Sequence, residues 1–247
     1  MTPECRADLK FISKTTRYSC DVTVTKRVID AIFRLGIVHV FIRVWKSVQT
    51  VDFLCTTTTG SSSAFSNLQL ALSIVWNCSD KSTLLCEKLV ETGVVLTILD
   101  ELASERLTSA DLVATTSERQ LYMVKAFLGI SHNVVRLCSG SRRVYRNANA
   151  VTTLQWYLHC QNSLVKTNAY IVLAYIVATE EDHSILNTDG QHLAFIVDVL
   201  QDAINNEQHL SKKFGFWAHE IVAGLNHLAR NDDNKTRYKA WPHEPLI

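Results

Sequence analysis

The clearest hydrophobic pattern in the chain lies between Leu70 and Leu102, where three apolar stretches are separated by short polar breaks. The first ends at the polar residues 77–80 (NCSD), and a short amphipathic stretch then runs to Gly93. A third apolar run follows from Val94. Apolar residues that recur every three or four positions predict helices, and asparagine, aspartate and glycine commonly end them. We therefore predict three consecutive helices, which cannot bury their apolar faces alone and imply stacked neighbours.

Similar patterns flank this stretch. Before it, residues 25–36 predict a helix that stops at a glycine, and residues 37–54 predict a second helix. After it, the sequence predicts a long helix, two short helices joined near Asn149, an almost wholly apolar helix, a further helix and a C-terminal one. Their ranges are 118–137, 144–160, 164–178, 192–204 and 232–240.

Two polar segments interrupt the pattern. Residues 55–66 (CTTTTGSSSAFS) and residues 104–117 are rich in serine and threonine. Such sequences favour flexible, exposed connections. We expect both segments to be surface loops.

The predicted short helices end at comparable points, namely Gly36, Gly93, Ala150 and Gly190. The steps are 93−36 = 57, 150−93 = 57 and 190−150 = 40. The last step matches the ~40–47 residues of known three-helix repeats, and the others fit the same unit with about fifteen inserted residues. The pattern predicts an all-α solenoid of about four repeats, the last one incomplete, over residues 25–241. Residues 1–24 are expected to be a poorly ordered or partly helical leader, and residues 242–247 a short irregular tail.

Composition adds constraints on partners and compartment. Lysine and arginine number 25 against 24 aspartates and glutamates, which gives a net charge of +1 and argues against dedicated binding of nucleic acid or anionic membrane. The seven cysteines are scattered without a CxxC pair, and the N-terminus lacks an apolar secretory core. We expect a protein of the cytoplasm or the nucleus with reduced thiols.

The sequence carries no pattern of a catalytic or metal centre. The nine histidines include no HxxxH pair, and His219 and His227 are two helical turns apart rather than one. No cysteine has a histidine partner that the sequence identifies. We expect no enzyme activity, no metal and no cofactor.

The residues 75–99 (VWNCSDKSTLLCEKLVETGVVLTIL) resemble the armadillo repeat, in which a long third helix leads into a short helix, a glycine turn and another helix. The resemblance covers about 25–241 and weakens at Ala150, where glycine is expected. It implies a right-handed solenoid whose long third helices line a concave groove. It also implies a protein-binding adaptor, because the family's groove asparagine holds the backbone of an extended partner segment.

Carried over to this chain, the resemblance assigns Asn77 and Asn133 to the groove, and Asn226 less closely. Trp76 and His132 are expected to face the same groove, with Tyr175 a weaker candidate. Side-chain amides both donate and accept hydrogen bonds, so they can hold a strand-like backbone. The alternative is that Asn77 and Asn226 only cap helices through local backbone bonds.

A second family leaves another function open. The stretches 173–190 (LAYIVATEEDHSILNTDG) and 211–235 resemble the armadillo regions of invertebrate proteins that carry a TIR signalling domain beyond the repeats. That resemblance implies a regulatory, autoinhibitory or ligand-sensing role in a signalling protein that consumes NAD. No TIR sequence occurs in residues 1–247.

The C-terminal end carries its own expectation. The helix 232–240 is expected to be the first of a further unit, and Pro242 biases Trp241 away from helical geometry. The aromatic and aliphatic side chains of residues 214–228 would then be covered on one side only. We expect this chain to be a truncated member of a longer family, with a C-terminal end that self-associates or binds a partner.

Overall fold

A computed structural model describes residues 59–108, 118–177 and 183–240, with isolated positions between 27 and 43. Regular structure in these residues is helical, apart from one isolated bridge between Leu210 and Trp217. The all-α prediction is therefore confirmed for the described part of the chain. Residues 1–24 and 242–247 lie outside it. The chain divides into two compact units, residues 1–150 and 151–247, and each is described by itself.

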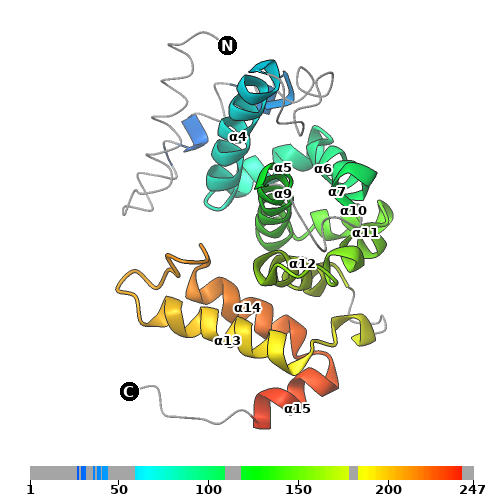
Figure 1. The fold of residues 1–247 in the computed structure, drawn as a ribbon, viewed down its shortest axis with the longest axis vertical. Coiled ribbons are helices and arrows are strands. Elements are labelled where there is room, and N and C mark those ends of the chain that lie inside the picture. Colours follow the sequence, from blue (N-terminus) through cyan, green and yellow to red (C-terminus); the bar gives the residue numbers. More distant parts are fainter. Residues whose placement is uncertain are drawn as a thin grey trace. The chain divides into compact units, whose positions relative to one another are not determined.

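Unit 1 is built around two long helices, α4 and α9, which pack side by side (Figure 1). Helices α5, α6 and α10 pack against one or both of them, and α7 packs against α6. The helices of this unit are α4 (Thr59–Ser79), α5 (Thr83–Glu91), α6 (Val94–Ala103), α7 (Glu105–Thr108), α9 (Glu118–Leu137) and α10 (Ser141–Asn147).

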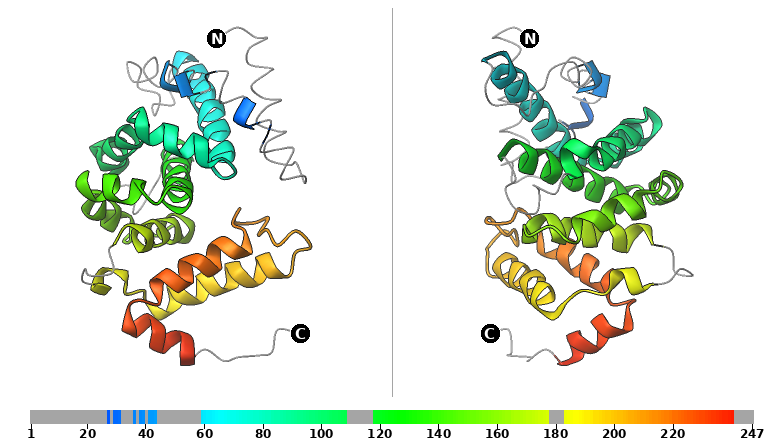
Figure 2. Two further views of the ribbon diagram at one scale, coloured as in Figure 1. Left: turned by 180° about the vertical axis from the view of Figure 1, so that it is seen from behind. Right: turned by 45° about the vertical axis from the view of Figure 1, so that its right-hand side comes forward.

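Unit 2 has the same kind of centre, because α12 packs against α14. Figure 2 shows α13 and α14, drawn in yellow and orange, running alongside each other. The elements are α11, which starts at the unit boundary (Ala150–Tyr157), α12 (Ser163–Ile176), the 3-10 helix η1 (His183–Leu186), α13 (Gly190–Ile204), α14 (Ala218–Leu228) and α15 (Asp232–Ala240).

The start of α4 corrects one prediction. Residues 59–66 were expected to form part of an exposed loop, but they are helical. Phe65 is buried and packs edge-on against Tyr122 of α9, with ring centroids 6.2 Å apart. This apolar contact stabilises a helix that serine-rich and threonine-rich sequence alone would not favour. The other predicted loop, residues 104–117, also begins with a helix, since residues 105–108 form α7. Leu107 of this helix is buried.

The glycine turns are confirmed in part. Gly36 and Gly93 have φ of 90° and 74°, the left-handed backbone that glycine adopts most easily. At the third position the left-handed residue is Asn149, with φ of 57°, rather than Ala150, which begins α11. Gly190 does not end a helix. It begins α13, and the preceding Asp189 caps that helix by accepting a hydrogen bond from the His192 N–H at 2.7 Å.

The core of each unit also contains polar residues. In unit 1, Ser82 caps α5 by accepting from the Leu85 N–H, and its hydroxyl donates to Asp30 Oδ1 at 2.9 Å. In unit 2, the fully buried Asn234 donates to the carbonyls of Leu186 and Leu228. These bonds fix where each chain segment turns, because buried polar groups must be satisfied.

Candidate functional site

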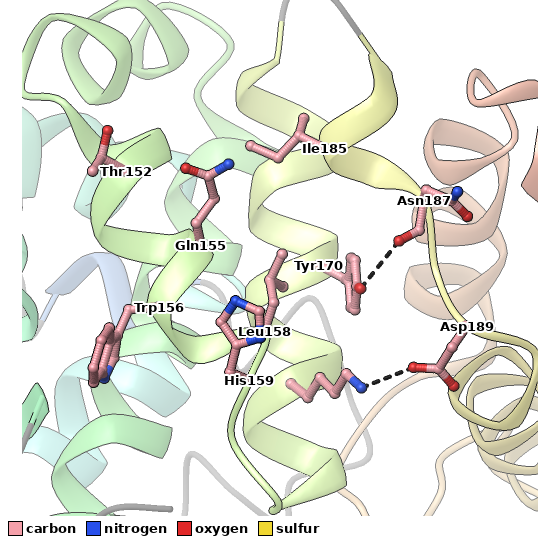
Figure 3. A pocket seen from close by; sticks show the side chains of 10 residues that line it. Thr152, Gln155, Trp156, Leu158, His159, Tyr170, Ile185, Asn187 and Asp189 are labelled. Carbon is pink, nitrogen blue, oxygen red and sulfur yellow. Dashed lines mark hydrogen bonds and ion pairs between the residues drawn. The ribbon is translucent and has the colours of Figure 1, made fainter. Parts of the chain in front are cut away.

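The best candidate site is an open groove in unit 2, with a volume of about 760 Å³. Figure 3 shows it between α11 on one side and residues 185–189 on the other, with α12 contributing residues between them. A groove of this size holds a short peptide segment or a small molecule. We call it the α11 groove.

The α11 wall of this groove presents Thr152, Gln155 and Trp156, which share one helix face because they are three or four positions apart. Trp156 is 45% exposed, an unusual state for so large an apolar ring. Helix α11 buries its opposite side through Ala150, Leu154 and Tyr157.

The opposite wall is held by two contacts to α12. The Tyr170 hydroxyl donates to the Asn187 carbonyl at 3.2 Å (Figure 3), and Lys166 Nζ forms an ion pair with Asp189 Oδ2 at 2.9 Å. Asp189 also caps α13, so the same carboxylate is bound from two elements. The wall is therefore preformed by contacts within unit 2.

The charges of the groove are set by these contacts. Burial alone would raise the pKa of Asp189, but the hydrogen bonds from Lys166 and from the His192 N–H outweigh it and lower this pKa. Burial lowers the pKa of His192 to about 4, and the nearby Lys166 charge acts in the same direction. The Asp189 carboxylate is therefore ionised, and the His192 ring, 5.4 Å from that of Tyr170, is neutral near pH 7.

The groups that line the groove suit the binding of a peptide. The groove offers an exposed indole face, an exposed amide and the His159 ring, which suit stacking and hydrogen bonding to a peptide. Burial raises the pKa of the Cys86 thiol, in unit 1, to about 12, so this cysteine is not a thiolate nucleophile. Among the described residues, no three His, Cys, Asp or Glu side chains gather as metal ligands.

Four of the predicted binding residues lie in unit 1. Trp76 and Asn77 are half-buried on α4, and His132 and Asn133 are buried on α9. Asn133 Nδ2 donates to the Trp76 carbonyl at 3.1 Å and to Ser79 Oγ at 2.9 Å, so its amide secures the end of α4. Trp76 lies against Gly129, where a Cβ atom would be 2.3 Å from the indole.

The other two predicted residues lie in unit 2. Tyr175 is buried on α12 and its ring packs on His227 of α14, with centroids 4.4 Å apart. Asn226 is exposed on α14. None of the six predicted residues lines the α11 groove. Their role in binding a partner stays a prediction, and it suits best those whose side chains reach the surface, namely Asn226, Asn77 and Trp76.

Sequence reasoning missed the groove, although one signal was present. The spacing of Ala150, Leu154 and Tyr157 marks the buried face of α11, and Trp156 falls outside it. A tryptophan out of phase with the apolar stripe of a short helix indicates an exposed ring. The ion pair between Lys166 and Asp189 carries no such signal, because it joins two residues that are 23 positions apart in the sequence.

Comparisons of the chain with family models, curated proteins and solved structures found no match. Within the described residues, no helix combines the length and the apolar character that crossing a membrane requires.

Proposed function

We propose that this protein is a non-catalytic interaction scaffold that holds an extended segment of another protein, and that the α11 groove is where it does so. The observation that carries the proposal is the exposed Trp156 ring on the wall of a preformed groove. Tryptophan is enriched among the residues that dominate the energy of protein interfaces. The exposed Gln155 amide beside it can both donate to and accept from a peptide backbone.

We further propose that the fold is a right-handed solenoid of armadillo type, in the cytoplasm or the nucleus. A long helix followed by a short element and a further helix occurs three times, beginning at α4, α9 and α12. Contacts between the long helices recur at equal sequence separations in the two units. Gly129 faces Trp76 and Gly224 faces Ile171, with 129−76 = 53 and 224−171 = 53. Equal separations support a repeated structural unit.

The experiment is selection from a library of displayed peptides against the purified full chain, followed by affinity measurement on the selected peptides. Replacing Trp156 by alanine is expected to weaken binding about tenfold or more, because a tryptophan at the centre of an interface contributes about 2 kcal/mol or more. Leu96→Ala is the matched control, since Leu96 is exposed to a similar degree, 43%, but lies on α6 in unit 1. It is expected to leave binding unchanged.

Two results would contradict the proposal. One is a selection that yields no peptide from folded protein. The other is a set of peptides that bind the Trp156→Ala and wild-type proteins equally well. Folding of each variant is checked by its helical circular dichroism.

A further inference from the structure

The wall of the α11 groove that faces α11 is bonded by the C-terminal helix α15 as well as by α12. The two helices meet at Asn187, which lines the groove (Figure 3). Its carbonyl accepts a hydrogen bond from Tyr170 of α12 at 3.2 Å. Its side-chain amide donates to Asp233 Oδ2 of α15 at 2.9 Å and accepts from Arg237 of α15 at 2.6 Å. Helix α15 therefore fixes the orientation of the Asn187 side chain.

The backbone on either side of Asn187 is bonded by the same helix. Thr188, which is fully buried, donates from its N–H to Asn234 Oδ1 at 3.0 Å. The Thr188 carbonyl accepts from Arg237 at 2.6 Å. The Asn234 amide also donates to the Leu186 carbonyl at 2.7 Å. Because buried backbone groups must be satisfied, these bonds determine the path of the wall.

The side chains that make these bonds lie on one face of α15. Asp233 and Asn234 precede Arg237 by four and three positions, so the three project from the same side of the helix. Just before the helix, the Asn231 amide donates to the His183 carbonyl at 3.0 Å. The contacts with this end of the chain thus extend from the start of η1 to the residue before the cap of α13.

Arg237 makes the largest share of the contacts with the wall. Its NH1 nitrogen lies 2.6 Å from Asn187 Oδ1, 2.6 Å from the Thr188 carbonyl and 3.3 Å from Asn234 Oδ1. Hydrogen bonds from a charged donor are stronger than those between neutral groups. Because a single nitrogen reaches all three acceptors, its loss would release two consecutive residues of the wall at once.

We propose that α15 positions the wall of the α11 groove, with Arg237 as the main positioning residue. The inference rests on the binding role proposed for the groove. A ligand that contacts Asn187 meets a side chain whose orientation is already fixed, so binding does not have to order it. Without Arg237, each binding event would bear that entropic cost. Arg237 does not itself line the groove, and it acts through Asn187 and Thr188.

Hydrogen exchange of the full chain, followed by mass spectrometry, tests the positioning without a ligand. Arg237→Met removes the donor and keeps an apolar stem of similar length. In the first minutes, the amides of residues 183–190 are expected to exchange about tenfold faster than in wild type, because a charge-assisted hydrogen bond is lost. The amides of α12 are expected to stay protected in both proteins. Unchanged exchange in residues 183–190 would overturn the proposal, and so would early exchange of α12, which would indicate general loosening of unit 2.

Peptides selected against the full chain then test the effect on binding. Arg237→Met is expected to bind them about tenfold more weakly, the factor that corresponds to ordering one residue. Arg237→Lys is expected to recover most of the affinity, because an ammonium group carries three donors and NH1 alone makes all three bonds. The matched control is Lys235→Met, which makes the same change of charge at an exposed position of the same helix. It is expected to bind as wild type does.

A second variant guards against misfolding of the first, and circular dichroism checks both. Asp233→Ala removes the other bond to the Asn187 side chain and is expected to weaken binding about threefold. Wild-type affinity in Arg237→Met, or in Asp233→Ala if Arg237→Met does not fold, would refute the positioning role and leave the proposed function intact. Equal weakening by Lys235→Met would also refute it. A selection that yields no peptide contradicts the proposed function instead, and the exchange experiment then decides the role of α15.

Discussion

The two units hold their central helix pairs together by corresponding contacts made with different side chains. In each unit a glycine on the second helix lies against a large side chain of the first, Gly129 under Trp76 and Gly224 under Ile171. In each unit an arginine also donates to carbonyls at the end of the first helix. Arg136 reaches the Asp80 carbonyl and Arg230 the Ala174 carbonyl, both 56 positions away.

The comparison shows which features of the pair are retained when the side chains differ. A glycine followed three positions later by a histidine occurs in both second helices, as 129–132 and as 224–227. The partner ring or alkyl chain changes, but the glycine still lets the two helices approach closely. The asparagine differs more. Unit 1 uses Asn133 within its helix pair, whereas unit 2 uses Asn234, which bonds to residues before α13 and at the end of α14.

The largest expected effect separates the two glycines. Gly129→Ala should lower the free energy of unfolding by about 3 kcal/mol, because the new Cβ would meet a rigid indole at 2.3 Å. Gly224→Ala should change it by about 1 kcal/mol or less. Its Cβ would be 3.0 Å from Ile171 Cγ1, a contact that a shift of a few tenths of an ångström relieves, and alanine improves helix propensity by about 1 kcal/mol. Urea unfolding followed by circular dichroism measures both, and equal losses would contradict this account of the packing.

These contacts indicate how much of the fold the sequence could predict. Helices 118–137 and 232–240 have the predicted bounds because their apolar or charged patterns and their flanking residues agree. The helical start of α4 could not be predicted, because it depends on Phe65 meeting Tyr122 on a helix more than fifty positions away. Local pattern reports which face of a helix is apolar, and it does not report which distant element covers that face.

The candidate site also combines features that local sequence can predict with features that depend on distant contacts. Trp156 could be identified from its phase on α11, since only local spacing is needed. The wall formed by Asn187 and Asp189 could not, since it depends on contacts with Tyr170 and Lys166. The asparagines of the predicted groove were chosen by resemblance, and burial of Asn133 depends on the packing of α9 against α4.

Replacing the buried asparagines Asn234 and Asn133 by alanine should lower the free energy of unfolding by different amounts. Asn234→Ala removes hydrogen bonds to Leu186, Leu228 and the Thr188 N–H, and we expect a loss of about 3 kcal/mol in the free energy of unfolding. Asn133→Ala removes bonds to one carbonyl and one hydroxyl, with an expected loss of about 2 kcal/mol. The exposed Asn226→Ala is the control, with a change of about 0.5 kcal/mol or less. A larger loss at position 133 than at position 234 would reverse the assigned roles.

A pH effect is expected from unit 2. The pKa of His192 is lowered from 6.5 to about 4, so the unfolded chain binds a proton at this residue at a higher pH than the folded chain does. The contribution of His192 to the free energy of unfolding is fully present above pH 6.5 and is lost as the pH falls toward 4. Between pH 7.5 and pH 5.0, wild type should lose about 2 kcal/mol more than the His192→Gln variant. Identical pH dependence of urea unfolding in the two proteins would show that His192 is not responsible.

The smallest expected effects compare the ion pairs of the two units. Arg136 and Asp80 are mostly buried, with side chains 14% and 23% exposed, and the arginine also holds the Asp80 carbonyl. Lys166 joins Asp189, which is 53% exposed and therefore well screened by water. Arg136→Met should lower the free energy of unfolding by about 1 kcal/mol, and Lys166→Met by about 0.5 kcal/mol or less. Thermal unfolding of both variants measures the difference. A larger loss from Lys166→Met would contradict this ranking. It would mean that the ion pair stabilises unit 2 more than the exposure of Asp189 indicates. The ion pair would then have to act through Asp189 as the cap of α13.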